Sequence, residues 1–319
     1  MRPRPEINLE DMHGGLARRR FLAMGCRFEV LLDREHASLD PGAIDAVAIG
    51  IDELVVDWHH RLSAFERGSI TACINNTPAG EPVAIDPEMY TLCALSERMR
   101  VLTGGCFNIA AGTMMHAIGF REESIGDLRG IDLQNAITLD ERRSTITRND
   151  ERVRIDFGGI AKGFVLDLVR EELAEYGIGN AFVHGGTSSI LAVGTDPDGH
   201  DWCVRTGSVN LCAGEYGIGI SEPTGRELND GNNRIGHIVD PRDREHSGRL
   251  IVGGGDERVA VVHGSAAVAD ALSTAVCVDE NSLGCAIDRG IGELSCVVRG
   301  VDGVDRVLID RLGVVSSQC

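Results

Sequence analysis

The sequence predicts a sheet-rich enzyme fold with packed helices rather than a helical bundle. Glycine supplies 40 of the 319 residues, a share that indicates many turns. Runs of alternating or continuously apolar residues, as at 28–32 and 152–157, are typical of strands. A stripe of apolar residues at helical spacing runs through 42–62. Hydrophobic residues make up 43% of the chain, which is enough for the core of one large domain or two small ones.

The same periodicities give the order of the elements. We expect a first strand at 21–33, helices at 42–62 and 86–102, and a polar loop at 63–82 between them. A charged connector with short strands covers 121–150, and further strands are expected at 152–157, 180–184, 190–193, 202–206, 216–221 and 258–262. A helix of small residues follows at 265–278, and then a hairpin that turns at Asp302-Gly303. We expect residues 1–18 to be a polar tail and 19–319 to form a single domain.

Charge and cysteine content narrow the function classes. A formal net charge of −18 argues against a nucleic-acid-binding face and disfavours docking to anionic membranes. The apolar residues that follow Arg18-Arg19-Arg20 are too few for a signal sequence. We therefore expect a cytoplasmic protein without membrane insertion. The ten cysteines include no CxxC pair, and most lie in apolar runs, which predicts buried thiols in a reducing compartment.

The single lysine of the chain stands at a predicted helix start, whereas the other basic residues are all arginine. Lys162 follows the glycine pair Gly158-Gly159, which allows positive φ and close approach of the backbone. Free N–H groups and the helix dipole at such a start favour an anion. The spacing matches neither a Walker loop nor the GxGxxG fingerprint. Lysine presents a compact point charge and arginine a planar fork, but chance retention of one lysine is an equally simple explanation.

Several other motifs have both a structural and a functional interpretation. The pair Gly185-Gly186 after a buried strand marks either a bulge or the close approach of a ligand. His237 precedes a short apolar run and an Asp-Pro turn, and a lone histidine is more often structural. Asp270 and Thr274 share one face of the small-residue helix. They either bind a hard cation together or form a solvent-facing polar pair. The segment 106–112 is either a pocket wall or a core crossing.

Four stretches, taken in order, resemble the FAD:protein FMN transferase family, also called the ApbE family. They are 155–163 (Ile-Asp-Phe-Gly-Gly-Ile-Ala-Lys-Gly), 185–186 (Gly-Gly), 236–241 (Gly-His-Ile-Val-Asp-Pro) and 269–275 (Ala-Asp-Ala-Leu-Ser-Thr-Ala). Weaker matches are 24–25, 61–63, Ser69 with Asn75, and 103–107. The resemblance covers roughly residues 21–310. It implies an α+β fold of mixed and antiparallel sheets with packed helices, in two intertwined subdomains. It also implies a Mg²⁺-dependent enzyme that takes FAD as its substrate, cleaves the pyrophosphate, attaches FMN to a threonine of another protein and releases AMP.

The resemblance also assigns roles to single residues. It implies that Asp270, Thr274 and the backbone carbonyl of Ala161 hold the metal. Lys162, His237 and Asp270 form the catalytic set, with Lys162 at the phosphates. The flavin nucleotide is then bound by Gly105, Phe107, Asn108, Gly158, Gly159, Lys162, Gly185, Gly186, Ser221 and His237.

The sequence departs from the family pattern mainly where the flavin would be held. The departures are Cys26 in place of a threonine, Asn108 in place of an aspartate, Thr187 in place of an acidic residue, and Glu222-Pro223-Thr224 in place of a Ser-Gly-Asp-Tyr-like segment. An acceptor protein with a Ser/Asp-Gly-x-Thr-like motif would act in trans. The alternative is a flavin-nucleotide-binding protein or an FAD pyrophosphatase that does not flavinylate proteins.

Overall fold

The computed structural model describes residues 10–12, 15–117, 127–223, 227–230, 233–243, 257–301 and 304–316. In these ranges helices pack on antiparallel sheets, so the α+β prediction is confirmed. Neighbouring strands of the largest described sheet are all antiparallel. In spatial order they are β1 (Glu10–Met12), β2 (Leu16–Ala23), β3 (Cys26–Asp33), β7 (Ala181–Gly185), β8 (Ser189–Val193), β11 (Glu215–Ser221), β14 (Arg258–His263), β15 (Leu294–Val301) and β16 (Val304–Asp310).

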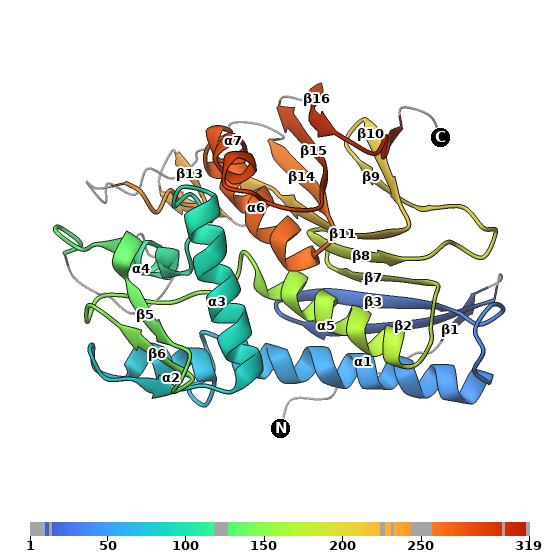
Figure 1. The fold of residues 1–319 in the computed structure, drawn as a ribbon, viewed down its shortest axis with the longest axis horizontal. Coiled ribbons are helices and arrows are strands. Elements are labelled where there is room, and N and C mark those ends of the chain that lie inside the picture. Colours follow the sequence, from blue (N-terminus) through green and yellow to red (C-terminus); the bar gives the residue numbers. More distant parts are fainter. Residues whose placement is uncertain are drawn as a thin grey trace.

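Both faces of the central strands of this sheet are covered. The helices α1 (Pro41–Leu62), α5 (Ala161–Glu175) and α6 (Ala266–Val278) form one layer against it (Figure 1). A small sheet of β9 (Trp202–Thr206), β10 (Val209–Ala213) and β17 (Val315–Ser316) packs on the other side. Strand β14 shows the division, because Val259 and Val261 belong to the helix-side core while Ala260 and Val262 join Leu211 of β10 in a second core. A strand buried on both faces has a continuous apolar run, as 259–262 has.

A smaller body is inserted between α1 and α5 in the sequence (Figure 1). Its strands form a second antiparallel sheet, and its longest helix, α3, contacts α6 and α7 (Asn281–Asp288). A further hairpin, β12 (Glu227–Asp230) and β13 (Asn233–Gly236), follows β11. The inserted elements are α2 (Ile70–Asn76), β4 (Val83–Ala84), α3 (Pro87–Leu102), η1 (Ile109–Ala111), α4 (Gly112–Ala117), η2 (Leu133–Asn135), β5 (Ile137–Asp140) and β6 (Thr145–Arg148).

Glycines bring α5, α6 and β11 unusually close together. A Cβ on Gly163 would lie 2.2 Å from the carbonyl oxygen of Ala266, and one on Gly217 would lie 2.3 Å from the Ala266 Cα. A Cβ on Gly219 would lie 2.4 Å from the Ala269 carbonyl carbon. Real Cβ atoms do not make such contacts, so these positions require glycine. The alternation of glycine and apolar residues in 216–221 therefore serves the packing of α6, and this packing sets the distance between α5 and α6.

The helix limits follow the capping residues. Asp40 precedes α1 and accepts hydrogen bonds from the amides of Gly42 and Ala43. Asp86 precedes α3 and accepts from the amide of Met89. An aspartate at this position satisfies amides that the helix itself leaves unpaired. The helices expected at 42–62 and 86–102 are therefore confirmed.

The start of the chain needs a correction. Residues 21–33 do not form one strand but parts of the β2–β3 hairpin, whose loop is Met24-Gly25. Strand β2 begins at Leu16 and pairs with β1, so residues 10–12 and 16–18 belong to the sheet and not to a polar tail. The continuous apolar pattern hides the turn because Met24 is not a typical turn residue. Strands β15 and β16 pair as expected, while Asp302-Gly303, Thr224 and residues 1–9 lie outside the described residues.

The expectation that all the cysteines are thiols is wrong for one pair. Cys203 on β9 and Cys212 on β10 lie opposite each other in the strand register and form a disulfide. Sequence spacing did not predict this pair, because only the register brings the two side chains together. Disulfides persist in oxidising environments, so this bond weakens the argument for a reducing compartment. Within the described part of the chain, no helix is both long and apolar enough to span a bilayer.

Candidate active site

One cavity of about 540 Å³ collects most of the stretches that the sequence singled out. Its wall contains residues from the β2–β3 turn, the segment 106–115, the turn at 156–162, the loop after β7, the end of β11, the segment 237–241 and helix α6. The volume is within the range of small-molecule sites. The segment 106–112 is therefore both packed in the core and part of a pocket wall.

Most of the predicted site residues line this cavity, and two do not. Those that line it are Phe107, Asn108, Gly158, Gly159, Ala161, Lys162, Gly186, Ser221, His237, Asp270 and Thr274. Gly105 has a positive φ of +85°, and a Cβ there would lie 2.3 Å from Oε1 of Gln134. A Cβ on Gly185 would lie 2.7 Å from the ring of Phe28. These two glycines are explained by packing behind the wall rather than by ligand approach.

Asp270 is buried beside the first turn of α5. Its Oδ2 accepts hydrogen bonds from the amide of Gly163 at 2.7 Å and from the hydroxyl of Ser189 at 2.8 Å. Burial raises the pKa of Asp270 to about 7, although the Lys162 charge and these two hydrogen bonds act in the opposite direction. Both hydrogen bonds end on Oδ2, so Oδ1 takes part in neither. The carboxyl group is thus held at a helix N-terminus, where a negative charge is favoured.

Hydroxyl groups extend this oxygen cluster along α6. The Ser221 Oγ lies 2.8 Å from the Ser273 Oγ and 3.2 Å from the Thr274 Oγ1. Asp270 and Thr274 both face the cavity, as their spacing of four residues predicts. The alternative of a solvent-facing pair is excluded because only 5% of Asp270 is exposed. Carboxylate, hydroxyl and backbone carbonyl oxygens together are the donor set of a hard cation such as Mg²⁺.

The glycine turn places Lys162 next to this cluster. The carboxylate of Asp156 accepts a hydrogen bond from the amide of Gly158 at 2.7 Å, which fixes the turn. A Cβ on Gly159 would lie 3.3 Å from both Phe107 and the Thr274 Oγ1, so this backbone passes close to both side chains. Lys162 lines the cavity and is near enough to Asp270 to lower the pKa of that carboxyl group. A positive charge and a buried carboxylate thus meet at the start of α5.

His237 reaches the cavity from a segment that is held by contacts of the residues just after it. Arg242 contacts the Asp240 carboxylate at 2.8 Å and the Asp279 carboxylate, at the end of α6, at 3.0 Å. The side chain of Gln134 donates to the carbonyl of Pro241 at 3.5 Å. These contacts place the half-buried His237 ring against the same space as Lys162. A catalytic role for the ring stays a prediction.

The side-chain amide of Asn108, one of the departures from the family pattern, makes two hydrogen bonds. Its Oδ1 accepts from the amide of Ala110 at 2.8 Å, and its Nδ2 donates to the carbonyl of Leu133 at 2.7 Å. A carboxylate has no N–H to give to that carbonyl. The amide therefore fits this position, because it links the start of η1 to the first residue of η2.

Sequence reasoning missed Ser189, which donates to Asp270. Ser189 is 1% exposed at the start of an otherwise apolar strand. A polar group in such a run needs a hydrogen-bond partner, and that signal marks it as a candidate. The partner itself was not predictable, because it lies 81 residues further along the chain.

Comparison with known proteins identifies the family of this chain. A family model described as "ApbE family" matches residues 24–294. The chain belongs to the ApbE family. A relative named FAD:protein FMN transferase from Rhodobacter capsulatus is 27% identical over 274 residues, which is 79% of this chain but 50% of that relative. A relative of the same name from Vibrio cholerae serotype O1 is 25% identical over 266 residues, 77% of this chain and 78% of that one.

Solved structures of ApbE proteins share the fold. The apbe protein from Thermotoga maritima superimposes with a TM-score of 0.75 at 20% identity, over 93% of this chain and 97% of that chain. The flavin transferase ApbE from Vibrio cholerae gives a TM-score of 0.74 at 22% identity with the same coverage. The antiparallel sheet with its helical layer is therefore the ApbE architecture. The chain spans about half the length of the R. capsulatus relative.

Proposed function

We propose that this ApbE-family chain transfers the FMN part of FAD to a threonine of a separate acceptor protein, with release of AMP and with Mg²⁺ as the required metal. The names of its relatives support flavin transfer to protein. The observation that carries the proposal is the meeting of Lys162, Asp270 and Thr274 around one cavity at the start of α5. This arrangement suits a pyrophosphate, which carries negative charge and needs positioning more than covalent chemistry.

The residues present fit a magnesium ion. Asp270, Thr274 and the carbonyl of Ala161 would hold it, because all three residues line the cavity and offer oxygen. Bound Mg²⁺ would offset negative charge on the pyrophosphate oxygens. The raised pKa of Asp270 means that its buried charge lacks sufficient compensation from the protein alone, as expected of a carboxylate built to face a cation.

The remaining steps use groups of the chain itself. Lys162 and the first turn of α5 bind the phosphates, and the glycine turn allows the nucleotide to approach the backbone. The threonine Oγ attacks the phosphorus of the FMN part, and the bond from that phosphorus to the bridging oxygen breaks, so that AMP leaves. The threonine proton passes to the imidazole of His237, which is within the same cavity.

A flavinylation assay tests the proposal. The chain is incubated with FAD, MgCl₂ and an acceptor domain that carries an Asp-Gly-x-Thr motif, and flavin on the acceptor is followed by in-gel fluorescence beside AMP release. We expect equal amounts of both products, and none of either when EDTA replaces Mg²⁺. An acceptor with Thr→Val is the matched control. AMP without attached flavin would indicate the FAD pyrophosphatase alternative, and activity in EDTA would contradict the metal assignment.

A further inference from the structure

We propose that His59, which does not line the cavity, is a positioning residue for FAD binding because it holds the Met24-Gly25 turn in the cavity wall. The inference rests on the proposed function, since it takes FAD as the ligand. It concerns a histidine at the end of α1 and a hairpin turn 35 residues earlier in the chain.

The Met24-Gly25 turn has a shape that needs external support. It is the two-residue loop of the β2–β3 hairpin, and both residues have positive φ, at +49° and +72°. Two-residue hairpin loops of this kind favour asparagine or aspartate followed by glycine. A methionine in the left-handed region is disfavoured sterically. Met24 also lines the cavity, with Cys26 just beyond it, so an unfavourable backbone here places a side chain in the site.

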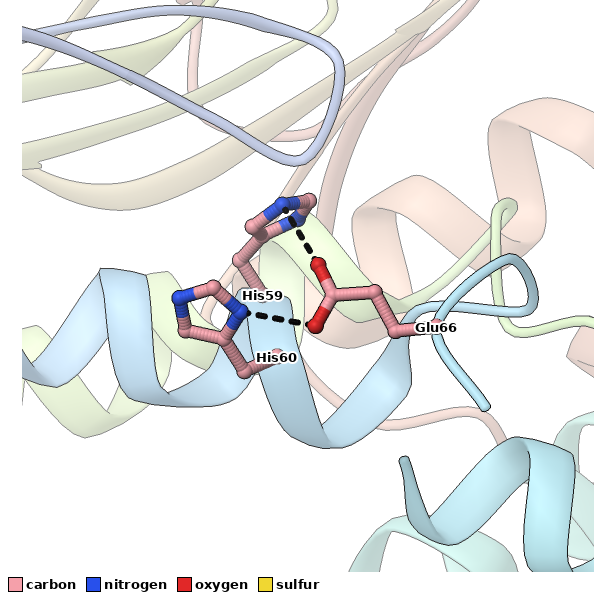
Figure 2. A group of neighbouring side chains, drawn as sticks. All are labelled: His59, His60 and Glu66. Atoms are coloured by element: carbon pink, nitrogen blue, oxygen red, sulfur yellow. Dashed lines mark hydrogen bonds and ion pairs between the residues drawn. The ribbon is translucent and has the colours of Figure 1, made fainter. Parts of the chain in front are cut away.

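His59 supplies the support through one hydrogen bond. The amide of Met24 donates to Nδ1 of His59 at 3.2 Å. Since Nδ1 is the acceptor, the proton of the neutral ring lies on Nε2. Nε2 faces the Oε1 of Glu66 at 3.7 Å, and the Oε2 of Glu66 lies 2.9 Å from Nδ1 of His60, as Figure 2 shows. Glu66 thus places its carboxylate on the Nε2 side of the ring, at a distance longer than a hydrogen bond, while the hydrogen bond from Met24 links the ring to the backbone of the turn.

The same geometry argues against the other use of this cluster. Nitrogen atoms of His59 and His60 and an oxygen of Glu66 lie within 4.8 Å of one another, close enough to suggest a metal site. A metal on Nε2 of His59 would move the ring proton to Nδ1, directly against the amide of Met24. His59 therefore cannot bind a metal through Nε2 and support the turn through Nδ1 at the same time. The hydrogen bond from the Met24 amide favours the support of the turn.

Two isosteric substitutions test which nitrogen matters. In His59→Asn, the side-chain oxygen is as many bonds from Cβ as Nδ1 is, so it can still accept from Met24. In His59→Gln, the polar group lies further out, near the place of Nε2. We expect His59→Gln to weaken FAD binding by about three- to tenfold, the effect of one hydrogen bond. We expect the kcat of both variants to stay within about twofold of wild type. The Kd of His59→Asn for FAD should also stay within about twofold of wild type. Flavin fluorescence in the absence of acceptor gives the Kd.

Hydrogen exchange provides a readout that is independent of activity. The amide of Met24 should exchange faster in His59→Gln than in wild type or His59→Asn, at an unchanged melting temperature. Glu66 is exposed, so Glu66→Ala tests the same link in a folded protein and should raise the Kd for FAD by about twofold, less than a full hydrogen bond. Equal Kd values and exchange rates in His59→Gln, Glu66→Ala and wild type would overturn the inference. One equivalent of Zn²⁺ bound by wild type and not by Glu66→Ala, measured by calorimetry, would also overturn it. If wild type itself fails to bind FAD, the proposed function fails instead.

Discussion

The two sides of the cavity are built in different ways. The helical wall (Lys162, Ser221, Asp270 and Thr274) sits on α5, α6 and β11, whose glycines leave no space between backbones. The turn wall (Met24, Cys26, Asn108 and His237) sits on loops that are held by a few side-chain hydrogen bonds. Departures from the family pattern at Cys26 and Asn108 fall on the turn wall, and the departure at Glu222 falls at the edge of the helical wall, directly after Ser221. We infer that the helical wall fixes the chemistry, whereas the turn wall adjusts what is bound.

The largest expected effect is on catalysis at the helical wall. Asp270→Asn keeps an oxygen for the amide of Gly163 and the hydroxyl of Ser189, but removes the charge that a cation needs. We expect Mg²⁺-dependent AMP release from FAD to fall by on the order of 10²–10³-fold, as when one preorganised electrostatic contact is lost. The melting temperature serves as the control for folding. Wild-type turnover in this variant would remove Asp270 from the metal site.

Lys162→Arg tests whether the helical wall accepts a bulkier cation in place of the lysine. Arginine keeps the positive charge but replaces a point charge with a bulkier planar fork. The neighbouring Gly163 packs against Ala266, so the backbone cannot shift to make room. We expect turnover to fall by on the order of 10²-fold from misplacement of the charge by about 1 Å, with little change in stability. Glu171→Gln, at an exposed position of α5, is the matched control. An active Lys162→Arg would mean that the lone lysine is an accident of composition.

The raised pKa of Asp270 predicts a pH dependence of stability in the metal-free protein. Between the unperturbed value of 3.8 and the folded value of about 7, the folded state binds more protons than the unfolded state. Stability from this group is therefore present below pH 4 and is lost as the pH rises to 7. The full loss is at most about 4 kcal/mol, since one pKa unit corresponds to about 1.4 kcal/mol. Asp270→Asn should gain stability relative to wild type over this range in denaturant titrations with EDTA. A constant difference between the two proteins would show that the pKa is not raised.

Gly163→Ala changes the packing of the helical wall itself. The added Cβ would meet the Ala266 carbonyl at 2.2 Å, so α5 and α6 must separate. We expect a loss of about 1–3 kcal/mol in the free energy of unfolding, the usual effect of overpacking. Gly179→Ala is the control, because a Cβ there meets nothing within 4 Å. Equal stability of the two variants would mean that the contact between α5 and α6 can relax. The helical wall would then not be more rigid than the turn wall.

The two walls also differ in how far the sequence could predict them. Local patterns predicted the helical wall, since the small residues of α6, the spacing of Asp270 and Thr274 and the glycine turn before Lys162 are all properties of short segments. The turn wall depends on contacts between distant segments, such as that between His59 and Met24, and periodicity contains no such information. Gly105 and Gly185 lie outside the cavity lining, and nearby side chains explain the lack of a Cβ there, a distinction between packing and ligand approach that the sequence does not contain. The Cys203–Cys212 disulfide was likewise not predictable without the register of β9 and β10.

The single lysine of this chain has a practical consequence. Amine-directed reagents can modify only the terminal amino group and one side chain, and that side chain lies in the cavity. The extent of acylation at Lys162, measured on the peptide that contains it, would therefore report occupancy of the pocket without any engineered label. A lysine-specific protease likewise has one internal cleavage position, between Lys162 and Gly163, where the chain is packed against α6. The rate of that cut measures how often this helix junction opens.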